Sequence, residues 1–375
     1  MLDEPVEPRQ WLLGNVLCRD FVTVLAASGG TGKTSLMLAW YLSLASGRAL
    51  IDVHVHKRCR VLILVFEDGR EEIKRRLKAA CMHYGIGADD IRGYLKVITL
   101  TGRGETLAIS DNGEMREGDL PGSIELLIEE HKIDVVSFDP FVKCSGAPEN
   151  DNASTDFVCR ILSRIAETKK VAVAIAHHTR KGASDPGNID SARGASALID
   201  AARIGLTLTS MDSGSAKDFG INENERRTYS RLDDGKTNLT VAEKAKWFKM
   251  ASVNLGNGTE DYPYGDNVQA IEPWTPPDAW ADLNASQLNR MLDDIRDGLD
   301  DGERYSAAPN AKDRAAWKVV HEHAPGKSDA QCRQIIKTWL KNDVLIEEKY
   351  RSPLSRKEVS GLSVNDEKRP GGSPE

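Results

Sequence analysis

The 375-residue chain contains no long hydrophobic run and only six cysteines. No stretch approaches the roughly 20 consecutive apolar residues that a membrane-spanning helix needs, and the acidic residues 1–8 lack the apolar segment of a signal peptide. The cysteines do not have the spacing of metal ligands, so we expect buried, reduced thiols rather than a zinc site or disulfides. These absences favour a cytoplasmic protein with no membrane partner.

The chain also lacks a general excess of positive charge. Its formal net charge of -7 excludes a uniformly basic coat for nucleic acid, although a local basic channel remains compatible with it. From residue 309 onward, 13 Lys and Arg face 10 Asp and Glu, so the excess of acid lies in the preceding part. This difference, and a length sufficient for two domains, predict a small C-terminal domain of another character.

A glycine-rich turn lies between an apolar run and a run of helix-forming residues. Strand, loop and helix in this order predict a phosphate-binding loop, in which backbone N–H groups and the helix N-terminus hold the phosphates of ATP. Lys33 would contact the β- and γ-phosphates and the Thr34 hydroxyl would bind Mg²⁺. Ala27 replaces the usual first glycine, which costs little if its φ is negative. The predicted nucleotide-binding residues are Ser28, Gly29, Gly30, Thr31, Gly32, Lys33, Thr34 and Ser35.

Two further apolar strands end in carboxylates. The strand predicted at residues 60–66 precedes Glu67 and Asp68, and the strand at 133–138 precedes Asp139. Downstream of a P-loop, an acid that closes an apolar strand is typical of a Walker B motif, so we expect Asp139 to hold Mg²⁺. Asp68 is in position to cap the helix predicted at residues 70–84. Glu67 then stands at the carboxyl end of a strand, where open α/β sheets bind ligands.

His177 and His178 follow another apolar strand, predicted at residues 171–176. Adjacent residues of a strand point to opposite faces, so the pair cannot easily share one metal ion. We expect one histidine to face the nucleotide and the other to pack in the interior. A structural role for both stays open.

The remaining pattern predicts an α/β fold, with a mostly parallel sheet and antiparallel edge strands in an ATPase domain at residues 1–275. The Pro-rich residues 273–277 are the expected boundary. A second domain at 276–364 shows three helical segments followed by a hairpin pattern, which suggests a winged helix that binds nucleic acid or docks proteins such as other replication proteins. Residues 365–375 are expected to be disordered. The further strands are predicted at residues 94–100, 203–209, 228–236, 245–253, 344–350 and 359–364, the helices at 121–131, 153–169, 195–202, 283–300, 313–324 and 328–342, and polar loops at 143–155, 184–193 and 211–227.

In this order, the P-loop, Glu67-Asp68, Asp139-Pro140 and the segment His177 to Lys181 resemble the RecA-like P-loop ATPases. The likeness covers residues 16–253 and is greatest to the RepA-type hexameric replicative helicases of plasmids and related phage ATPases. The resemblance implies ATP and Mg²⁺ as cofactors, a homo-hexamer and single-stranded DNA as a partner. It makes Glu67 the general base and His178 the γ-phosphate sensor.

The resemblance further implies that Arg203 reaches the nucleotide of a neighbouring subunit, although this arginine could instead cover a helix-to-strand junction. It assigns DNA binding to loops that carry Lys143, Arg180 and Lys181. Three functions stay open: a DNA helicase, an ATP-switched DNA-binding or loading protein that does not unwind, and a metabolic kinase. The last lacks an acceptor-binding lid.

Overall fold

The computed structural model describes residues 4–111, 114–144, 152–179, 186–188, 196–240 and 243–371. The chain forms two compact units. The first contains Met1–Met211 and Arg227–Thr275, and the second contains Asp212–Arg226 and Pro276–Glu375. A short segment from the last quarter of the expected ATPase domain therefore belongs with the C-terminal unit.

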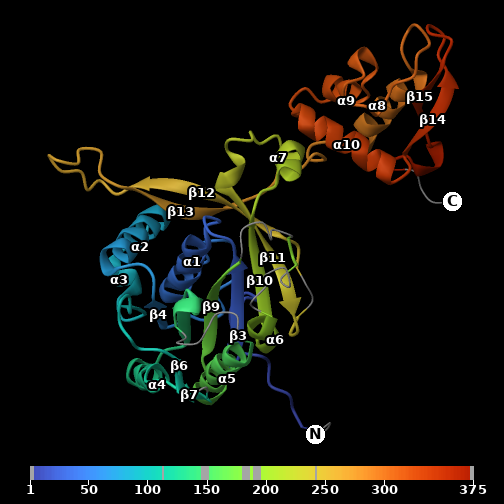
Figure 1. Ribbon diagram of the computed structural model, residues 1–375. Coiled ribbons are helices and arrows are strands. Elements are labelled where there is room, and N and C mark those ends of the chain that lie inside the picture. Colours follow the sequence, from blue (N-terminus) through green and yellow to red (C-terminus); the bar gives the residue numbers. More distant parts are fainter. Residues whose placement is uncertain are drawn as a thin grey trace. The chain divides into compact units, whose positions relative to one another are not determined.

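The first unit is built on a nine-stranded sheet (Figure 1). The six strands from β10 to β5 pair in parallel, and β11, β12 and β13 continue the sheet as antiparallel strands on one side. The α/β class, with a mostly parallel sheet and antiparallel edge strands, is thus confirmed. In spatial order the strands are β13 (Asn267–Trp274), β12 (Lys246–Asn254), β11 (Tyr229–Thr237), β10 (Ile204–Ser210), β3 (Val22–Ala27), β9 (Ala172–His178), β8 (Val135–Asp139), β4 (Val61–Val65) and β5 (Leu95–Thr99).

Helices cover both faces of this sheet, so its central strands are apolar along their whole length. One core packs α4 and α5 against one face, and the other packs α1 and α2 against the opposite face. The helices of this unit are α1 (Lys33–Ser46), α2 (Arg70–Tyr84), α3 (Ala88–Ile91), α4 (Leu120–His131), α5 (Asn152–Lys169) and α6 (Ser196–Ala201), and two small hairpins pair β1 (Trp11–Leu13) with β2 (Leu17–Cys18) and β6 (Ala108–Asp111) with β7 (Glu114–Glu117).

Several elements were not predicted from the sequence, among them the β6–β7 hairpin, strand β13 and helix α7 (Ser213–Phe219). The Pro-rich composition of residues 273–277 predicted a domain boundary there and not a strand. In the structure Pro273 instead belongs to β13, where it pairs with Phe248 of β12. Strand β13 is the last strand on that side of the sheet. An edge strand accepts a proline whose nitrogen faces away from its neighbour.

The second unit contains the three helices and the hairpin that the sequence predicted. Its core joins side chains of the helices and strands, with Trp339 at 2% exposure among them. The elements are α8 (Ala285–Asp297), α9 (Trp317–His323), α10 (Asp329–Lys341), β14 (Leu345–Arg351) and β15 (Glu358–Val364), joined by α7 from the middle of the chain.

The end of the chain differs from the expected disordered tail. Asp366–Lys368 forms a turn of 3₁₀ helix, and the Arg369 guanidinium lies 3.0 Å from the Asp293 carboxylate of α8. Asn289 also donates a hydrogen bond to the carbonyl of Pro370 at 2.9 Å. These contacts with α8 hold the backbone in place up to Gly371, although the segment contains little apolar surface.

Among the described helices, none combines the length and apolar character required to cross a membrane.

Candidate nucleotide-binding site

The glycine-rich loop leaves β3 at the sheet's carboxyl edge and begins α1 at Lys33. Ala27 continues the strand ladder, pairing with His178 of β9 and Leu208 of β10, so alanine fits the place of the usual first glycine. Gly30 and Gly32 have φ values of 80° and 90°, in the left-handed region that favours glycine. The sequence-derived strand, loop and helix are therefore all present.

Strands far along the chain support this loop from outside. Ser230 of β11, fully buried, donates a hydrogen bond of 2.6 Å to the carbonyl of Thr31. A Cβ added to Gly32 would lie 2.0 Å from the Cε atom of Met250 on β12. Sequence reasoning missed both supports because nothing in the local pattern around Ser230 or Met250 shows that their strands reach the loop.

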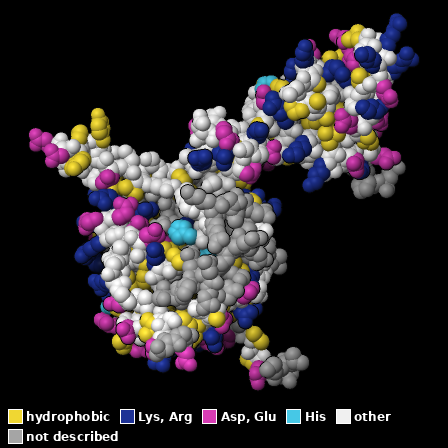
Figure 2. Space-filling model, viewed as in Figure 1, with side chains coloured by type: hydrophobic (Ala, Val, Ile, Leu, Met, Phe, Trp, Pro, Cys, Tyr) yellow, Lys and Arg dark blue, Asp and Glu magenta, His cyan; other side chains and the backbone are white. Residues whose placement is uncertain are grey.

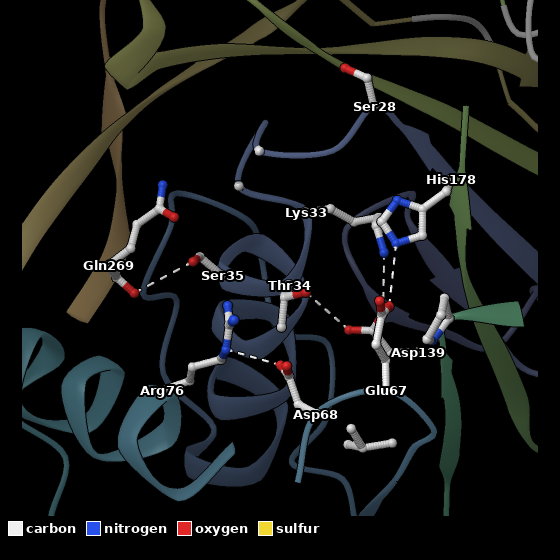
Figure 3. A pocket seen from close by; sticks show the side chains of 14 residues that line it. Ser28, Lys33, Thr34, Ser35, Glu67, Asp68, Arg76, Asp139, His178 and Gln269 are labelled. Atoms are coloured by element: carbon white, nitrogen blue, oxygen red, sulfur yellow. Dashed lines mark hydrogen bonds and ion pairs between the residues drawn. The ribbon is translucent and has the colours of Figure 1, made fainter. Parts of the chain in front are cut away.

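A pocket of about 380 Å³ opens beside the loop (Figure 3). Nothing lies within 4 Å of where a Cβ would stand on Gly29 or Gly30, so the loop has room for phosphate groups. Of the predicted nucleotide-binding residues, Gly29 and Thr31 do not line the pocket. The lining residues are Ser28, Gly30, Gly32, Lys33, Thr34, Ser35, Val65, Glu67, Asp68, Arg76, Asp139, Pro140, His178 and Gln269.

Asp139, at the end of β8, bridges the first two residues of α1. The Lys33 ammonium lies 3.1 Å from one carboxylate oxygen, and the Thr34 hydroxyl donates to the other at 3.1 Å. Lys33 is only 5% exposed, and a buried ammonium requires such a partner. A hydroxyl and a carboxylate are hard oxygen ligands of the kind that Mg²⁺ prefers, so Thr34 and Asp139 fit a magnesium ion.

Glu67 and His178 stand beside that cluster. His178 Nε2 lies 3.9 Å from a carboxylate oxygen of Glu67, and Figure 3 shows both side chains at the end of the pocket that contains Lys33. Glu67 is 60% exposed and therefore open to water. Burial, and next the charge of Lys33, lower the pKa of His178, although Glu67 and Asp139 act in the opposite direction. The imidazole is thus neutral near pH 7, with the polar character a phosphate sensor needs.

The two histidines face opposite sides, as the alternation along a strand predicts. His177 is 7% exposed and packs near the ring of Phe141, whereas His178 lines the pocket. Burial lowers the pKa of His177 to about 4, with the neighbouring His178 and Lys33 as smaller causes. Of this pair, only His178 is available to a nucleotide.

The prediction that Asp68 caps α2 is wrong. The residue at the N-cap is Gly69, with no side-chain cap. One Asp68 oxygen instead lies 3.0 Å from Arg76 Nε, in the second turn of α2. Burial raises the pKa of Asp68, the charge of Arg76 opposes that rise, and nearby carboxylates add to it. The Asp68 carboxylate therefore holds Arg76 in place and does not cap the N-terminus of α2.

Arg76 and Gln269 line the pocket but were not predicted. Arg76 is held by Asp68 and, at 3.2 Å, by Glu72. Gln269 comes from β13, and its carbonyl accepts a hydrogen bond of 3.5 Å from the Ser35 hydroxyl. Figure 3 shows both on the side of the pocket away from His178. No sequence motif marks either residue, because their approach depends on α2 and β13 packing together.

The other predicted residues lie outside this pocket. Arg203 precedes Ile204, which pairs with Thr23, whereas the P-loop follows the pair of Leu208 with Ala27. Arg203 therefore stands at the opposite end of β10 from the loop of its own chain. Lys143 ends the 3₁₀ turn Phe141–Lys143 after β8 and is exposed. Arg180 and Lys181 lie outside the described residues, as do most of the two predicted DNA-binding loops.

The N-terminal half of the chain is similar to a known family. Residues 1–184 match a family model described as AAA domain. The matched stretch runs from the chain start through the P-loop, both strand-end carboxylates and His178, and it ends before Arg203. The match supports an ATPase of the P-loop type for this part of the chain. The match does not distinguish RepA-type helicases from other P-loop ATPases.

Proposed function

We propose that the protein is an oligomeric DNA helicase that uses ATP hydrolysis to act on single-stranded DNA in plasmid or phage replication. The observation that carries the ATPase part is the joint presence of Lys33, Thr34 and Asp139 within 3.1 Å contacts, with Glu67 and His178 beside them. Phosphoryl transfer depends on positioning and charge stabilisation, and these groups supply both.

Each side chain has a distinct task in this proposal. Lys33 and the loop N–H groups bind the β- and γ-phosphates. Thr34 and Asp139 would hold Mg²⁺, whose positive charge would offset the negative charge of the phosphate oxygens. Glu67 orients the attacking water and accepts its proton, for which its exposure to solvent is suited. Neutral His178 donates a hydrogen bond to the γ-phosphate and so distinguishes ATP from ADP.

The proposal includes a ring, with six subunits as in the RepA-type helicases. The pocket lacks an arginine at its Glu67 end among the described residues, since Arg76 lies on the other side. Arg203 stands at the far end of the sheet from the loop of its own chain, which is compatible with action on a neighbour's nucleotide. An arginine supplied in trans would couple hydrolysis to movement between subunits.

For single-stranded DNA, the support is the position of Lys143. It is exposed immediately after the strand that carries Asp139, so a strand bound there would sense the state of the nucleotide through β8. Arg180 and Lys181 follow His178 in the sequence in the same way. Cations at these loops would contact phosphates without regard to base sequence.

The decisive experiment measures ATP turnover with and without single-stranded DNA, the mass of the complex in ATP, and unwinding of a forked duplex. DNA-stimulated turnover by a hexamer that separates strands is the expected result. Slow turnover by an assembly that binds DNA without separating strands would support an ATP-switched loading protein instead. The absence of ATP hydrolysis under all these conditions contradicts both.

A further inference from the structure

The second unit contains a helix pair whose outer helix is basic on one side. Five residues separate α9 from α10, and the β14–β15 hairpin follows α10. Cys332, Ile335, Ile336 and Trp339 bury one face of α10 in the core. At 100° per residue, Lys337 and Lys341 point away from that face, with Arg333 beside Lys337 and Gln334 beside Lys341. We call this set, together with Ala330, the outward face of α10.

The outward face suits duplex DNA. An α-helix fits into the major groove, where arginine, lysine and glutamine side chains contact base edges and phosphates. The hairpin tip adds Arg351, Arg356 and Lys357, all exposed, and Figure 2 shows Lys and Arg side chains at the end of this unit. Single-stranded binding relies on aromatic platforms, and the outward face of α10 contains no aromatic residue. Duplex DNA is therefore the better match.

A segment from the middle of the chain lies on this face. Asp212–Arg226, which we call the α7 segment, belongs to the second unit. Its Asp218 lies 3.7 Å from the ammonium of Lys337. A Cβ added to Gly220 would lie 3.8 Å from the Cβ atom of Ala330. The segment thus occupies the middle and the N-terminal half of the face that would enter the groove.

The contact between the segment and α10 is loose. A solvent-open pocket of about 670 Å³ lies between them, lined by Lys217, Trp317, Arg333, Ile336 and Leu340 among others. Water can therefore enter between the segment and α10, whereas side chains of a protein core leave few gaps of that size. The pair of Asp218 and Lys337 is at least half exposed on both sides and contributes little stability. A helix of seven residues is also marginal alone.

We propose that the α7 segment is a removable cover, and that α10 binds duplex DNA through its outward face once this cover is displaced. The segment contains four acidic and two basic residues, so it presents negative charge to the same cations that phosphates would contact. It is joined at both ends to the ATPase sheet, through β10 and β11. Displacement of the cover is therefore linked by the chain to the strands beside the P-loop.

The proposal is tested on the full-length protein without nucleotide, so its outcome is independent of ATP hydrolysis. Met211 donates a hydrogen bond of 3.0 Å to the Tyr229 carbonyl, so the chain ends flanking the segment are adjacent. Residues 212–226 can therefore be replaced by Gly-Gly. Fluorescence anisotropy with a labelled 20-base-pair duplex measures affinity, with the same-length single strand as comparison. If the cover is closed about nine-tenths of the time, its removal raises duplex affinity about tenfold.

Point variants keep the test valid if the shortened chain does not fold. Asp218→Asn removes the pair with Lys337, and we expect about a two- to fivefold gain in duplex affinity at low salt. The matched control is Glu223→Gln, which removes the same charge from the same segment. Glu223 pairs with Arg226 at 2.5 Å, inside the segment, so this control should leave the affinity unchanged. Equal gains in both variants would contradict the cover and indicate a general charge effect.

A second pair of variants locates the binding face. In the uncovered protein, Lys337→Ala should weaken duplex binding and lower the salt dependence of log Kd by about one unit, as expected for one lost phosphate contact. Lys318→Ala, which removes a partly exposed lysine of α9 outside the proposed face, should not. The proposal is overturned if removal of the segment leaves duplex affinity unchanged in a folded protein. It is equally overturned if the gain persists after Lys337→Ala or is as large for the single strand.

Discussion

The Lys33 ammonium lies 3.1 Å from the carboxylate of Asp139. This ion pair joins the first residue of α1 to the last residue of β8, so the helix after the glycine-rich loop and the strand that ends in Asp139 meet at one point. The same carboxylate accepts a hydrogen bond from Thr34. We therefore expect a nucleotide bound at the loop to compete with Asp139 for Lys33.

Lys33→Ala should abolish ATP hydrolysis. The variant removes the cation nearest the expected phosphates and leaves the buried side of Asp139 without its ion pair. Steady-state phosphate release at saturating ATP measures the effect. Lys74→Ala, which removes a 73% exposed lysine from α2, is the matched control and should keep its turnover. Turnover of Lys33→Ala near that of the unmodified protein would exclude the P-loop assignment.

Glu67→Gln should bind ATP but turn it over roughly 10²–10⁴ times more slowly, because the amide cannot accept a proton from water. Binding is followed with a fluorescent ATP analogue and turnover with phosphate release. Asp68→Asn is the comparison, since Asp68 is paired with Arg76 instead of facing water. A larger loss of turnover in Asp68→Asn would reverse the roles of the two acids.

The sequence predicted those parts of the site that depend on local order. The glycines before Lys33 and the apolar strands before Glu67, Asp139 and His178 show in any window of about ten residues. Parallel strands bring their carboxyl ends to one edge, so the residues at these ends could be assigned to a single pocket from the order of the elements alone. The continuous apolar strands, likewise, indicated a sheet covered on both faces.

The unpredicted parts depend on contacts between segments far apart in the chain. Ser230 holds Thr31 across 199 residues, and Gln269 reaches Ser35 across 234. Neither Ser230 nor Gln269 lies in a motif. Gln269 belongs to β13, which was not predicted because Pro273 near its end indicated a domain boundary instead. The prediction for Asp68 was wrong because an acid just before a helix can either cap the helix or pair with an arginine about two turns later. The sequence around Asp68 is the same in both cases. Packing of α2 decided between them.

Gly32→Ala should destabilise the first unit by more than about 1 kcal/mol. Its φ of 90° disfavours any side chain, and the new Cβ would meet Met250. Gly29→Ala is the matched control, because that site has open space around it and no positive φ. Urea unfolding followed by far-ultraviolet circular dichroism compares the two. Equal midpoints would show that Gly32 does not hold this conformation.

His177 should make stability fall in mild acid. Its pKa is lowered to about 4 in the folded protein, against about 6.5 when unfolded, so the unfolded chain binds the proton more readily. Stability is then complete above about pH 6.5 and falls as the pH drops toward 4, by at most about 3 kcal/mol. Urea midpoints between pH 7 and 4.5 should show a smaller slope for His177→Gln. The exposed His54→Gln should retain the slope of the unmodified protein.

Arg203→Ala should bind ATP and assemble normally but hydrolyse about 10³–10⁵ times more slowly, if this arginine completes the site of a neighbouring subunit. Arg203 precedes the end of β10 that lies opposite the glycine-rich loop, so it is not placed to reach the pocket of its own chain. Mixing provides the test. Arg203→Ala and Lys33→Ala subunits are each expected to be inactive, yet a mixed ring places an intact P-loop beside an intact Arg203. ATPase activity that returns on mixing supports action in trans. If subunits that are shown to exchange by mass measurement remain inactive, the arginine only covers the helix-to-strand junction, and the shared site that the ring proposal requires is absent.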